Sequence, residues 1–217
     1  MRRLVETLGA IALLANAFLA NVFLANVAGA ANYDEGVNGD LSANAGAPTA
    51  WVLEAGDNLL TGAAGVGATE ADYDLITFTI PAGHQLDALT LTDFSLSVSY
   101  VSFLGLQSGA TWTAGFDWGV VGDSLLGWVL FDPGYVDKNM LPEIGVNGEA
   151  FDEDGGFTPP LASGIYTMLL QDTVGALTYG LNFSVSAIPE PSTLGLGALG
   201  LLGVGLRRRC AKPRAAG

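Results

Sequence analysis

Hydrophobic and polar residues alternate through the middle of the chain. In DLITFTIPAG, Ile76, Phe78 and Ile80 share one face, the threonines between them share the other, and residues 81–83 end the run. In TYGLNFSV, large side chains again occupy every second position. No stretch of the middle carries a sustained helical period, so the pattern predicts β-strands.

The run LDALTLTDFSLSVSYVSF alternates through Leu89 and Leu91 and then changes phase to Phe94 and Leu96. A slip of one residue moves every later side chain to the opposite face of a strand. We therefore expect a bulge or bend at Asp93. Further strands are predicted in TAWVLEAGDN, ATWTAGFDW, LGWVLFD and GIYTMLLQD.

About seven to nine short strands, separated by turns of Gly, Asp and Asn, predict an antiparallel sandwich. The least regular part of the chain is 135–160, which contains FDEDGGFTPP. We expect that segment to be a long exposed loop.

Charge separates this middle from the two ends. The protein has 217 residues, of which 22 are acidic and 8 are Lys or Arg, for a net charge of −14. Lys138 is the only Lys or Arg between Ala31 and Pro189. Because a nucleic-acid binder needs clustered Lys and Arg to displace counterions, the composition excludes nucleic acid as a partner.

The first 30 residues have the form of a secretory signal, with basic residues at 2–3 followed by a long apolar stretch. Ala28 and Ala30 provide the A-x-A site that signal peptidase accepts, and we predict cleavage after Ala30. The alternative is an uncleaved membrane anchor. Asn16, Asn21 and Asn26 disfavour it, because each amide costs free energy in lipid.

A second apolar run, rich in Gly and Leu, lies near the C-terminus and is followed by Arg207, Arg208 and Arg209. A helix over 192–206 would be about 22 Å long, shorter than the hydrocarbon core of about 30 Å. The arginines nevertheless match a helix stopped with its C-terminus in the cytoplasm. We therefore predict a transmembrane helix. Cys210 lies beyond it, so the middle of the chain contains no disulfide.

Pro189, Glu190 and Pro191 stand immediately before this run. The prolines fix φ and keep the preceding residues extended, which suits a processing enzyme that binds an open strand. Together, the Pro-Glu-Pro motif, the apolar helix and the arginines resemble the PEP-CTERM sorting signal of bacterial exported proteins, also known as an ice-binding protein C-terminal motif. The resemblance implies that the tail holds the protein at the inner membrane until an exosortase cuts near the motif. It also implies an association with exopolysaccharide and biofilm.

The middle of the chain has its own resemblance. The stretches YDEGVNGDLS, EAGDN, ADYDLITFTIPAGHQL and LASGIYTMLLQ…LTYGLNFSV look like the bacterial pre-peptidase C-terminal domain, a jelly-roll-like sandwich attached to secreted enzymes and surface proteins. We therefore expect an all-β, antiparallel, jelly-roll-like β-sandwich over 31–186. A signal helix in 1–30 and a transmembrane helix in the sorting tail, 187–217, would flank it.

Acidic and amide side chains gather at two places, which suggests a metal site. Glu35, Asn38 and Asp40 open the domain, and Asp72 and Asp74 precede the next strand. Oxygen ligands of this kind suit Ca²⁺. The resemblance implies the same ion, because some pre-peptidase domains bind calcium through such segments. The alternative is that these residues only form turns and a soluble surface. No other cofactor is expected.

The sequence offers little for catalysis. His84 is the only histidine, so a Ser-His-acid triad would have a single candidate base, and no carboxylate pair stands out for glycoside hydrolysis. We expect no enzymatic activity. Trp118 and Tyr135, beside Gly and Asp turns, are the aromatic residues most suited to stacking on sugar rings, although Trp and Tyr more often fill cores.

These features predict a non-catalytic exported protein of the cell envelope or extracellular matrix. It would be anchored transiently in the inner membrane and then delivered to the cell surface or outside the cell. Its expected partners are signal peptidase, exosortase, the inner membrane and exopolysaccharide. The alternative hypothesis is a surface protein of the same fold that resembles a carbohydrate-binding module. An ice-binding role would need long regular Thr arrays, and TFT and TLT are too brief.

Overall fold

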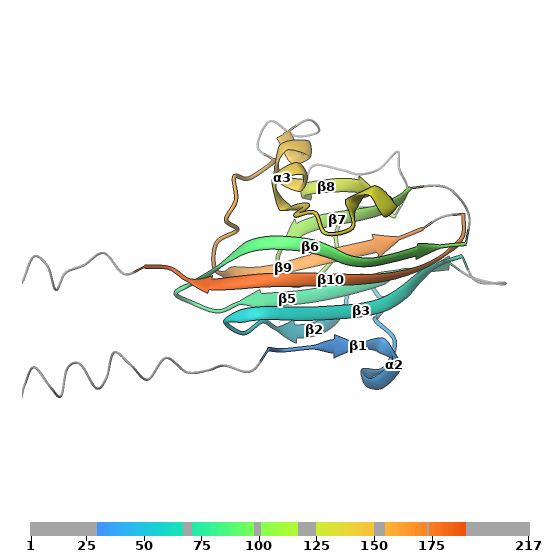
Figure 1. The fold of residues 1–217 in the computed structure, drawn as a ribbon, viewed down its shortest axis with the longest axis horizontal. Coiled ribbons are helices and arrows are strands. Elements are labelled where there is room, and N and C mark those ends of the chain that lie inside the picture. Colours follow the sequence, from blue (N-terminus) through green and yellow to red (C-terminus); the bar gives the residue numbers. More distant parts are fainter. Residues whose placement is uncertain are drawn as a thin grey trace, which may run out of the picture. The chain divides into compact units, whose positions relative to one another are not determined.

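The computed structural model describes residues 30–66, 71–97, 101–116, 125–149, 155–172 and 174–189. The chain divides into two units, Met1–Ser186 and Ala187–Gly217. Within the described ranges, the chain is mostly β-strand in two sheets (Figure 1). Those ranges hold no helix with the length and apolar character needed to cross a membrane. The predicted signal helix and transmembrane helix lie outside them, apart from Ala30.

The first sheet has five strands in the order β1–β3–β10–β6, with β4 also paired to β3. The bounds are β1 (Tyr33–Asp34), β3 (Gly56–Val66), β4 (Ala71–Asp72), β6 (His84–Leu96) and β10 (Ala176–Ala187). β10 runs antiparallel to β3, whereas β1 runs parallel to it. The single strand predicted in TAWVLEAGDN is therefore wrong in part. A separate strand, β2 (Thr49–Val52), ends at Val52, and the Gly-Asp-Asn of EAGDN begins β3.

The second sheet also has five strands, in the order β2–β5–β9–β7–β8. The bounds are β2 (Thr49–Val52), β5 (Asp74–Ile80), β7 (Ser102–Ser108), β8 (Leu125–Phe131) and β9 (Gly164–Gln171). All pairs are antiparallel except β2 with β5. The prediction of a purely antiparallel sandwich is thus wrong at two pairs, each involving a short N-terminal strand at a sheet edge.

The main core lies between the sheets. Ile76, Phe78 and Ile80 of β5 are buried there, as their alternation predicted. The ring of Phe183 in β10 meets the rings of Trp51 at 5.2 Å and Phe78 at 5.3 Å, both edge to face. Burial of each such side chain stabilises the fold by roughly 1.5–3 kcal/mol. The two sheets therefore share one hydrophobic core.

A second, smaller core lies on the other face of the second sheet. Leu75 and Leu169 are buried there beneath Trp112, which is 4 % exposed. The expected strand in ATWTAGFDW is wrong for its described part, because 110–116 forms no strand. The backbone of 110–116 makes hydrogen bonds outside the sheet instead. Trp112 N donates to the Ala45 carbonyl, and Thr113 N donates to the Gln107 side-chain oxygen.

The expectation of a long exposed loop over 135–160 is also wrong. After the short 3₁₀ turn η1 (Pro133–Tyr135), the helix α3 (Leu141–Glu149) covers β8. Leu141 and Ile144 of this helix are fully buried. Gly145 and Gly148 of this helix allow the backbone carbonyls of Phe157 and Leu126 to approach closely, which a Cβ would block. The two glycines also weaken the apolar period in the sequence.

The change of phase predicted in β6 is confirmed. Leu89 and Leu91 are buried, Phe94 and Leu96 pack against the same core, and Asp93 between them is exposed. Because Asp93 faces out, the outer surface of the first sheet carries a carboxylate at this point.

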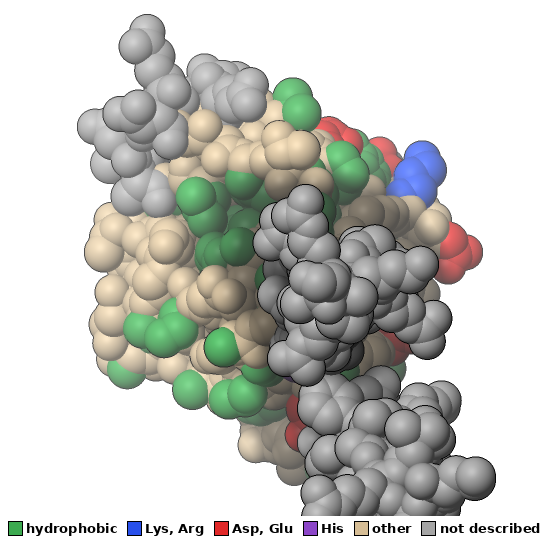
Figure 2. Space-filling model, turned by 90° about the vertical axis from the view of Figure 1, so that its left-hand side faces the viewer, with side chains coloured by type: hydrophobic (Ala, Val, Ile, Leu, Met, Phe, Trp, Pro, Cys, Tyr) green, Lys and Arg blue, Asp and Glu red, His purple; other side chains and the backbone are tan. Residues whose placement is uncertain are grey.

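One end of the sandwich is drawn in Figure 2, where hydrophobic side chains form separate groups and acidic ones lie toward the margin. Exposed large hydrophobic residues of the described ranges include Val52 and Ile165. Single apolar residues of this kind are ordinary on soluble surfaces and do not by themselves indicate a partner.

Candidate metal centre

A tight turn after β1 sets the position of the first acidic group. In the one-turn helix α2 (Glu35–Asn38), Asp34 caps the start by accepting a hydrogen bond from Gly36 N at 2.9 Å. The Asn38 side-chain oxygen accepts one from Asp34 N, also at 2.9 Å. Asn38, a predicted metal ligand, therefore uses its oxygen to hold the turn.

Three of the predicted ligands come together. One carboxylate oxygen each from Glu35, Asp40 and Asp74 lies within 4.8 Å of the others. Glu35 belongs to α2, Asp40 follows it, and Asp74 begins β5 in the second sheet. The only Lys or Arg in the described part of the chain is Lys138, whose ammonium lies over the Tyr135 ring. No basic side chain of these ranges compensates the cluster.

Glu35 is held by two backbone groups. Its Oε2 accepts a hydrogen bond from Ala63 N at 2.7 Å, and its Oε1 accepts one from Leu41 N at 3.1 Å. Burial raises the pKa of Glu35, these two bonds oppose the rise, and the charges of Asp40 and Asp72 add to it. Each oxygen retains a further lone pair for a cation.

Asp74 is the deepest member, with 0 % exposure. Its Oδ2 accepts a hydrogen bond from the Tyr179 hydroxyl at 2.7 Å, while its Oδ1 has no hydrogen-bond partner among the described residues. Burial raises the pKa of Asp74 to about 8, against the Tyr179 bond and with the help of the charges on Glu35, Asp72 and Asp40. A buried carboxylate oxygen without a hydrogen-bond partner costs free energy, so binding of a proton or a cation at Asp74 Oδ1 would be favourable.

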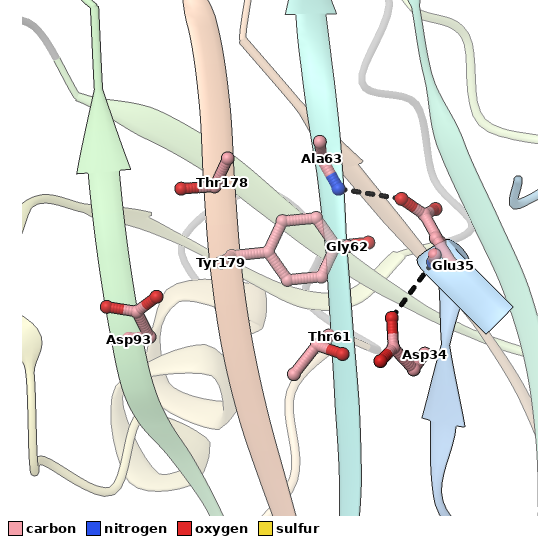
Figure 3. Close-up of a pocket in the computed structure, with 9 residues that line it drawn as sticks. Asp34, Glu35, Thr61, Gly62, Ala63, Asp93, Thr178 and Tyr179 are labelled. Carbon is pink, nitrogen blue, oxygen red and sulfur yellow. Dashed lines mark hydrogen bonds between the residues drawn. The ribbon is translucent and has the colours of Figure 1, made fainter.

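The sequence reasoning missed Tyr179 and Gly62, which complete the wall of the cluster. Tyr179 of β10 stands opposite Gly62 of β3, and its ring extends across that glycine toward Glu35 (Figure 3). A Cβ at Gly62 would lie 2.6 Å from the Tyr179 hydroxyl and 2.7 Å from the Glu35 carboxyl carbon. A glycine inside a strand is the sequence signal for such close approach.

Asp72 lies near the cluster without joining the group of three. It is half-buried in β4 opposite Gly65, and burial, followed by the charge of Asp40, raises its pKa. Its own charge contributes to the raised pKa of both Glu35 and Asp74. Asp72 therefore adds negative potential to the site.

These residues fit a hard divalent cation. Three carboxylates from two segments, 35–40 and the start of β5, converge, and one oxygen of Asp74 is buried and without a hydrogen-bond partner in the described part of the chain. Ca²⁺ takes six to eight oxygen ligands, several of which are often water. Glu35, Asp40 and Asp74 would hold such an ion, and it would supply the positive charge that the surrounding side chains lack.

A pocket of about 280 Å³ lies beside the cluster, on the side of α2, β3, β10 and β6. Its walls include Asp34, Glu35 and Asp93, with Thr61 and Thr178 between them (Figure 3). The pocket carries carboxylates on opposite sides, and Glu35 belongs both to its wall and to the candidate centre.

The predicted sugar-stacking residues have a different outcome. The Tyr135 hydroxyl donates to the Glu143 carboxylate at 2.8 Å, its ring packs partly against the core, and the Lys138 ammonium lies 5.6 Å from the ring centre. Trp118 lies outside the described residues. Sugar stacking by Tyr135 and Trp118 therefore stays a prediction.

The predicted processing sites lie at the margins of the described chain. Ala30 and Pro189 are exposed. The others lie outside the described residues, namely Ala28, Glu190, Pro191, Arg207, Arg208 and Arg209.

Comparison with known proteins assigns the tail. Residues 187–209 match the PEP-CTERM protein-sorting motif. No curated protein and no solved structure matches the chain. The resemblance of the body to the pre-peptidase C-terminal domain is therefore not confirmed by any match. The matched motif implies an exported protein that is sorted by an exosortase and held transiently at a membrane before processing.

Proposed function

We propose that this protein is a non-catalytic component of the cell surface or extracellular matrix, delivered by exosortase and stabilised by calcium. The sorting motif at 187–209 is the observation that supports delivery by exosortase. In this proposal the tail anchors the chain in the bacterial inner membrane with its C-terminus in the cytoplasm. The delivered sandwich then associates with exopolysaccharide.

Removal of the signal segment after Ala30 belongs to the same proposal. Ala30 is exposed, whereas Ala31 packs partly against the core. Ala31 N donates to the buried Asn58 Oδ1 at 3.2 Å. Cleavage between these residues would keep the contacts of Ala31 with the sandwich, which supports this site over one further along the chain.

A structural role for calcium is supported by where the three carboxylates come from. Glu35 and Asp40 lie beside the first sheet, and Asp74 belongs to the second. An ion held by all three would join both sheets and the N-terminal segment. Binding to the folded state alone stabilises a protein by about 2.7 kcal/mol at a ligand concentration of 100 Kd.

The absence of catalysis is proposed from the surroundings of the candidate base. A ring nitrogen of His84 lies 3.2 Å from the carbonyl of Ala82 in its own turn. Both oxygens of Glu35 accept backbone hydrogen bonds. Groups engaged in this way favour a structural over a catalytic role.

Delivery is tested by fractionating cells that contain an exosortase. We expect the full chain in the membrane fraction, followed by a shortened form at the surface or in the medium. Replacing Pro189, Glu190 and Pro191 with alanine should leave the full chain at the membrane, whereas the matched control Asp57→Asn, on the exposed start of β3, should be processed normally. Full-length protein recovered only from the cytosol would refute the proposal.

A further inference from the structure

β3 is a long strand whose outer edge is only partly paired. On its inner side, β10 pairs with it from Gly65 to Gly56. On its outer side, two short strands pair with it: β1 at Leu60 and Thr61, and β4 at Gly65 and Val66. The outward-facing donors of β3 that these short strands leave unpaired need other acceptors.

Residues 31–40, here called the N-terminal strap, supply those acceptors. The Asn32 side-chain oxygen accepts a hydrogen bond from Leu59 N at 3.1 Å. The Glu35 carboxylate accepts one from Ala63 N at 2.7 Å. β3 itself, GDNLLTGAAGV, has neither Lys nor Pro, the residues that commonly prevent an edge strand from pairing with another chain. Protection of this edge therefore depends on the strap.

Little apolar burial holds the strap in place. α2 has no buried residue, and Val37 is 80 % exposed. Ala31 and Tyr33 contact the core only as partly buried residues, and the Tyr33 hydroxyl donates within the strap, to the Gly39 carbonyl. The contacts that fix α2 on β3 thus centre on the carboxylate of Glu35.

That same carboxylate belongs to the acidic cluster. Asp40 ends the strap, and Asp74 belongs to β5 in the opposite sheet. Without a cation, ionised carboxylates at this spacing repel one another, and wherever Asp74 is ionised the repulsion acts to push the strap away from the body. A bound cation reverses the sign of this interaction and joins the strap to β5.

We propose that calcium latches the N-terminal strap over the edge of β3. With the ion bound, the edge is covered. Without it, the strap opens and the edge is free to pair with another strand. This inference rests on the calcium site proposed above and adds to it a conformational consequence of occupancy.

Hydrogen exchange of the full chain in detergent tests the latch directly. The exchange rates of the Leu59 and Ala63 amides are compared at one pH with calcium and with a chelator. We expect chelation to accelerate exchange at both amides about tenfold or more through local opening. Amides of β9, which lies between two strands in the second sheet, serve as the internal reference and should change much less.

Two variants test the charge of Glu35. Glu35→Gln keeps one oxygen, which can accept from Ala63 N or Leu41 N but not from both, and it removes the negative charge that would hold the ion. Its β3 exchange should therefore no longer respond to calcium. The matched control is Asp57→Asn, which removes an exposed carboxylate from the same strand, outside the cluster. Its calcium response should equal that of the wild type.

Calorimetric titration with calcium on the same samples separates the latch from the site. If calcium does not bind, the proposed site fails and the latch fails with it. If calcium binds while exchange at Leu59 and Ala63 is unchanged by chelation, the latch is overturned and the site stands. If the β9 amides respond as strongly as those of β3, the ion acts on global stability and the latch is again overturned.

Discussion

Asp74 and Asp172 are both buried among the described residues, and their surroundings differ sharply. Asp172, 2 % exposed, follows β9 and accepts hydrogen bonds from the Ser102 hydroxyl and from the backbone N–H groups of Val174 and Gly175. Asp74, at the start of the neighbouring strand β5, accepts one bond from Tyr179 and leaves Oδ1 without a partner in the described part of the chain.

The difference separates a structural carboxylate from a binding one. The protein satisfies Asp172 from its own chain, as buried charges require. Asp74 is instead surrounded by Glu35, Asp40 and Asp72, whose charges raise its pKa further. A site built this way is stable only when a proton or a cation arrives from solution.

The largest effect is expected at the satisfied aspartate. Asp172→Ala would leave the Ser102 hydroxyl and two backbone N–H groups, one of them buried, without an acceptor, so we expect a loss of about 4 kcal/mol in unfolding free energy. The loss should be the same with calcium and with a chelator. Denaturant unfolding in both buffers measures it, and a loss seen only with calcium would break the comparison.

The next effect is expected at Gly62. Gly62→Ala would place a Cβ against the Tyr179 hydroxyl and Glu35, so we expect destabilisation of about 2–3 kcal/mol and loss of the calcium-dependent shift in Tm. Gly46→Ala is the matched control, because its Cβ would make only an ordinary contact at 3.5 Å with Asn44. Equal thermal melts for the two variants would contradict the close packing at Gly62.

The unfolding free energy of the calcium-free protein should fall as the pH rises from about 5 to about 8. The pKa of Asp74 is raised to about 8 from 3.8, and those of Glu35 and Asp72 are raised as well. The stability contributed by protonated Asp74 is full below its unfolded pKa and is lost as pH rises toward 8. The charged and titratable groups that face it are Glu35, Asp40, Asp72 and Tyr179.

In chelator we therefore expect stability to fall by about 1–2 kcal/mol from about pH 5 to pH 8, within the limit of about 4 kcal/mol that about 1.4 kcal/mol per pH unit sets for one group over this interval. Saturating calcium should remove this loss, because the ion replaces the proton. Denaturant titrations across that range measure the trend. A calcium-free protein that gains stability over the same interval would show that Asp74 is ionised without penalty.

The smallest effect is expected for Tyr179→Phe. The variant removes one hydrogen bond to Asp74 Oδ2 and keeps the ring, so it should lower stability by about 1 kcal/mol. Tyr166→Phe is a suitable control, because that hydroxyl donates to a backbone carbonyl away from the cluster. Only the Tyr179 variant should alter calcium affinity, as calorimetry would report.

The sequence predicted the parts of the fold that follow a strict period. In β5 and β10 large side chains recur at every second position, as in Ile76, Phe78 and Ile80, and this was enough to assign the face toward the main core. α3 was missed because Gly145 and Gly148 interrupt its apolar face. The sequence did not predict that β1 runs parallel to β3 and β2 parallel to β5. Strand direction depends on the path of the chain, which periodicity does not record.

The acidic cluster was anticipated only in part, and for physical reasons. Glu35, Asp40 and Asp74 could be named because carboxylates near turns are candidate ligands. Their convergence depends on strand register, as does the contact of Tyr179 with Asp74, which joins residues far apart in sequence. Asn38 stays a predicted ligand whose oxygen also accepts a local hydrogen bond from Asp34 N, a contact that the sequence did not reveal.

The central claim is that Asp74, unlike Asp172, is built to be completed by calcium. Isothermal calcium titration of the wild type, Asp74→Asn and Asp172→Asn, each in the full chain, tests it most directly. The account predicts one tightly bound ion in the wild type and in folded Asp172→Asn, and loss of that binding in Asp74→Asn, which keeps an acceptor for the Tyr179 hydroxyl. Undiminished binding in Asp74→Asn, or no binding by the wild type, would contradict it.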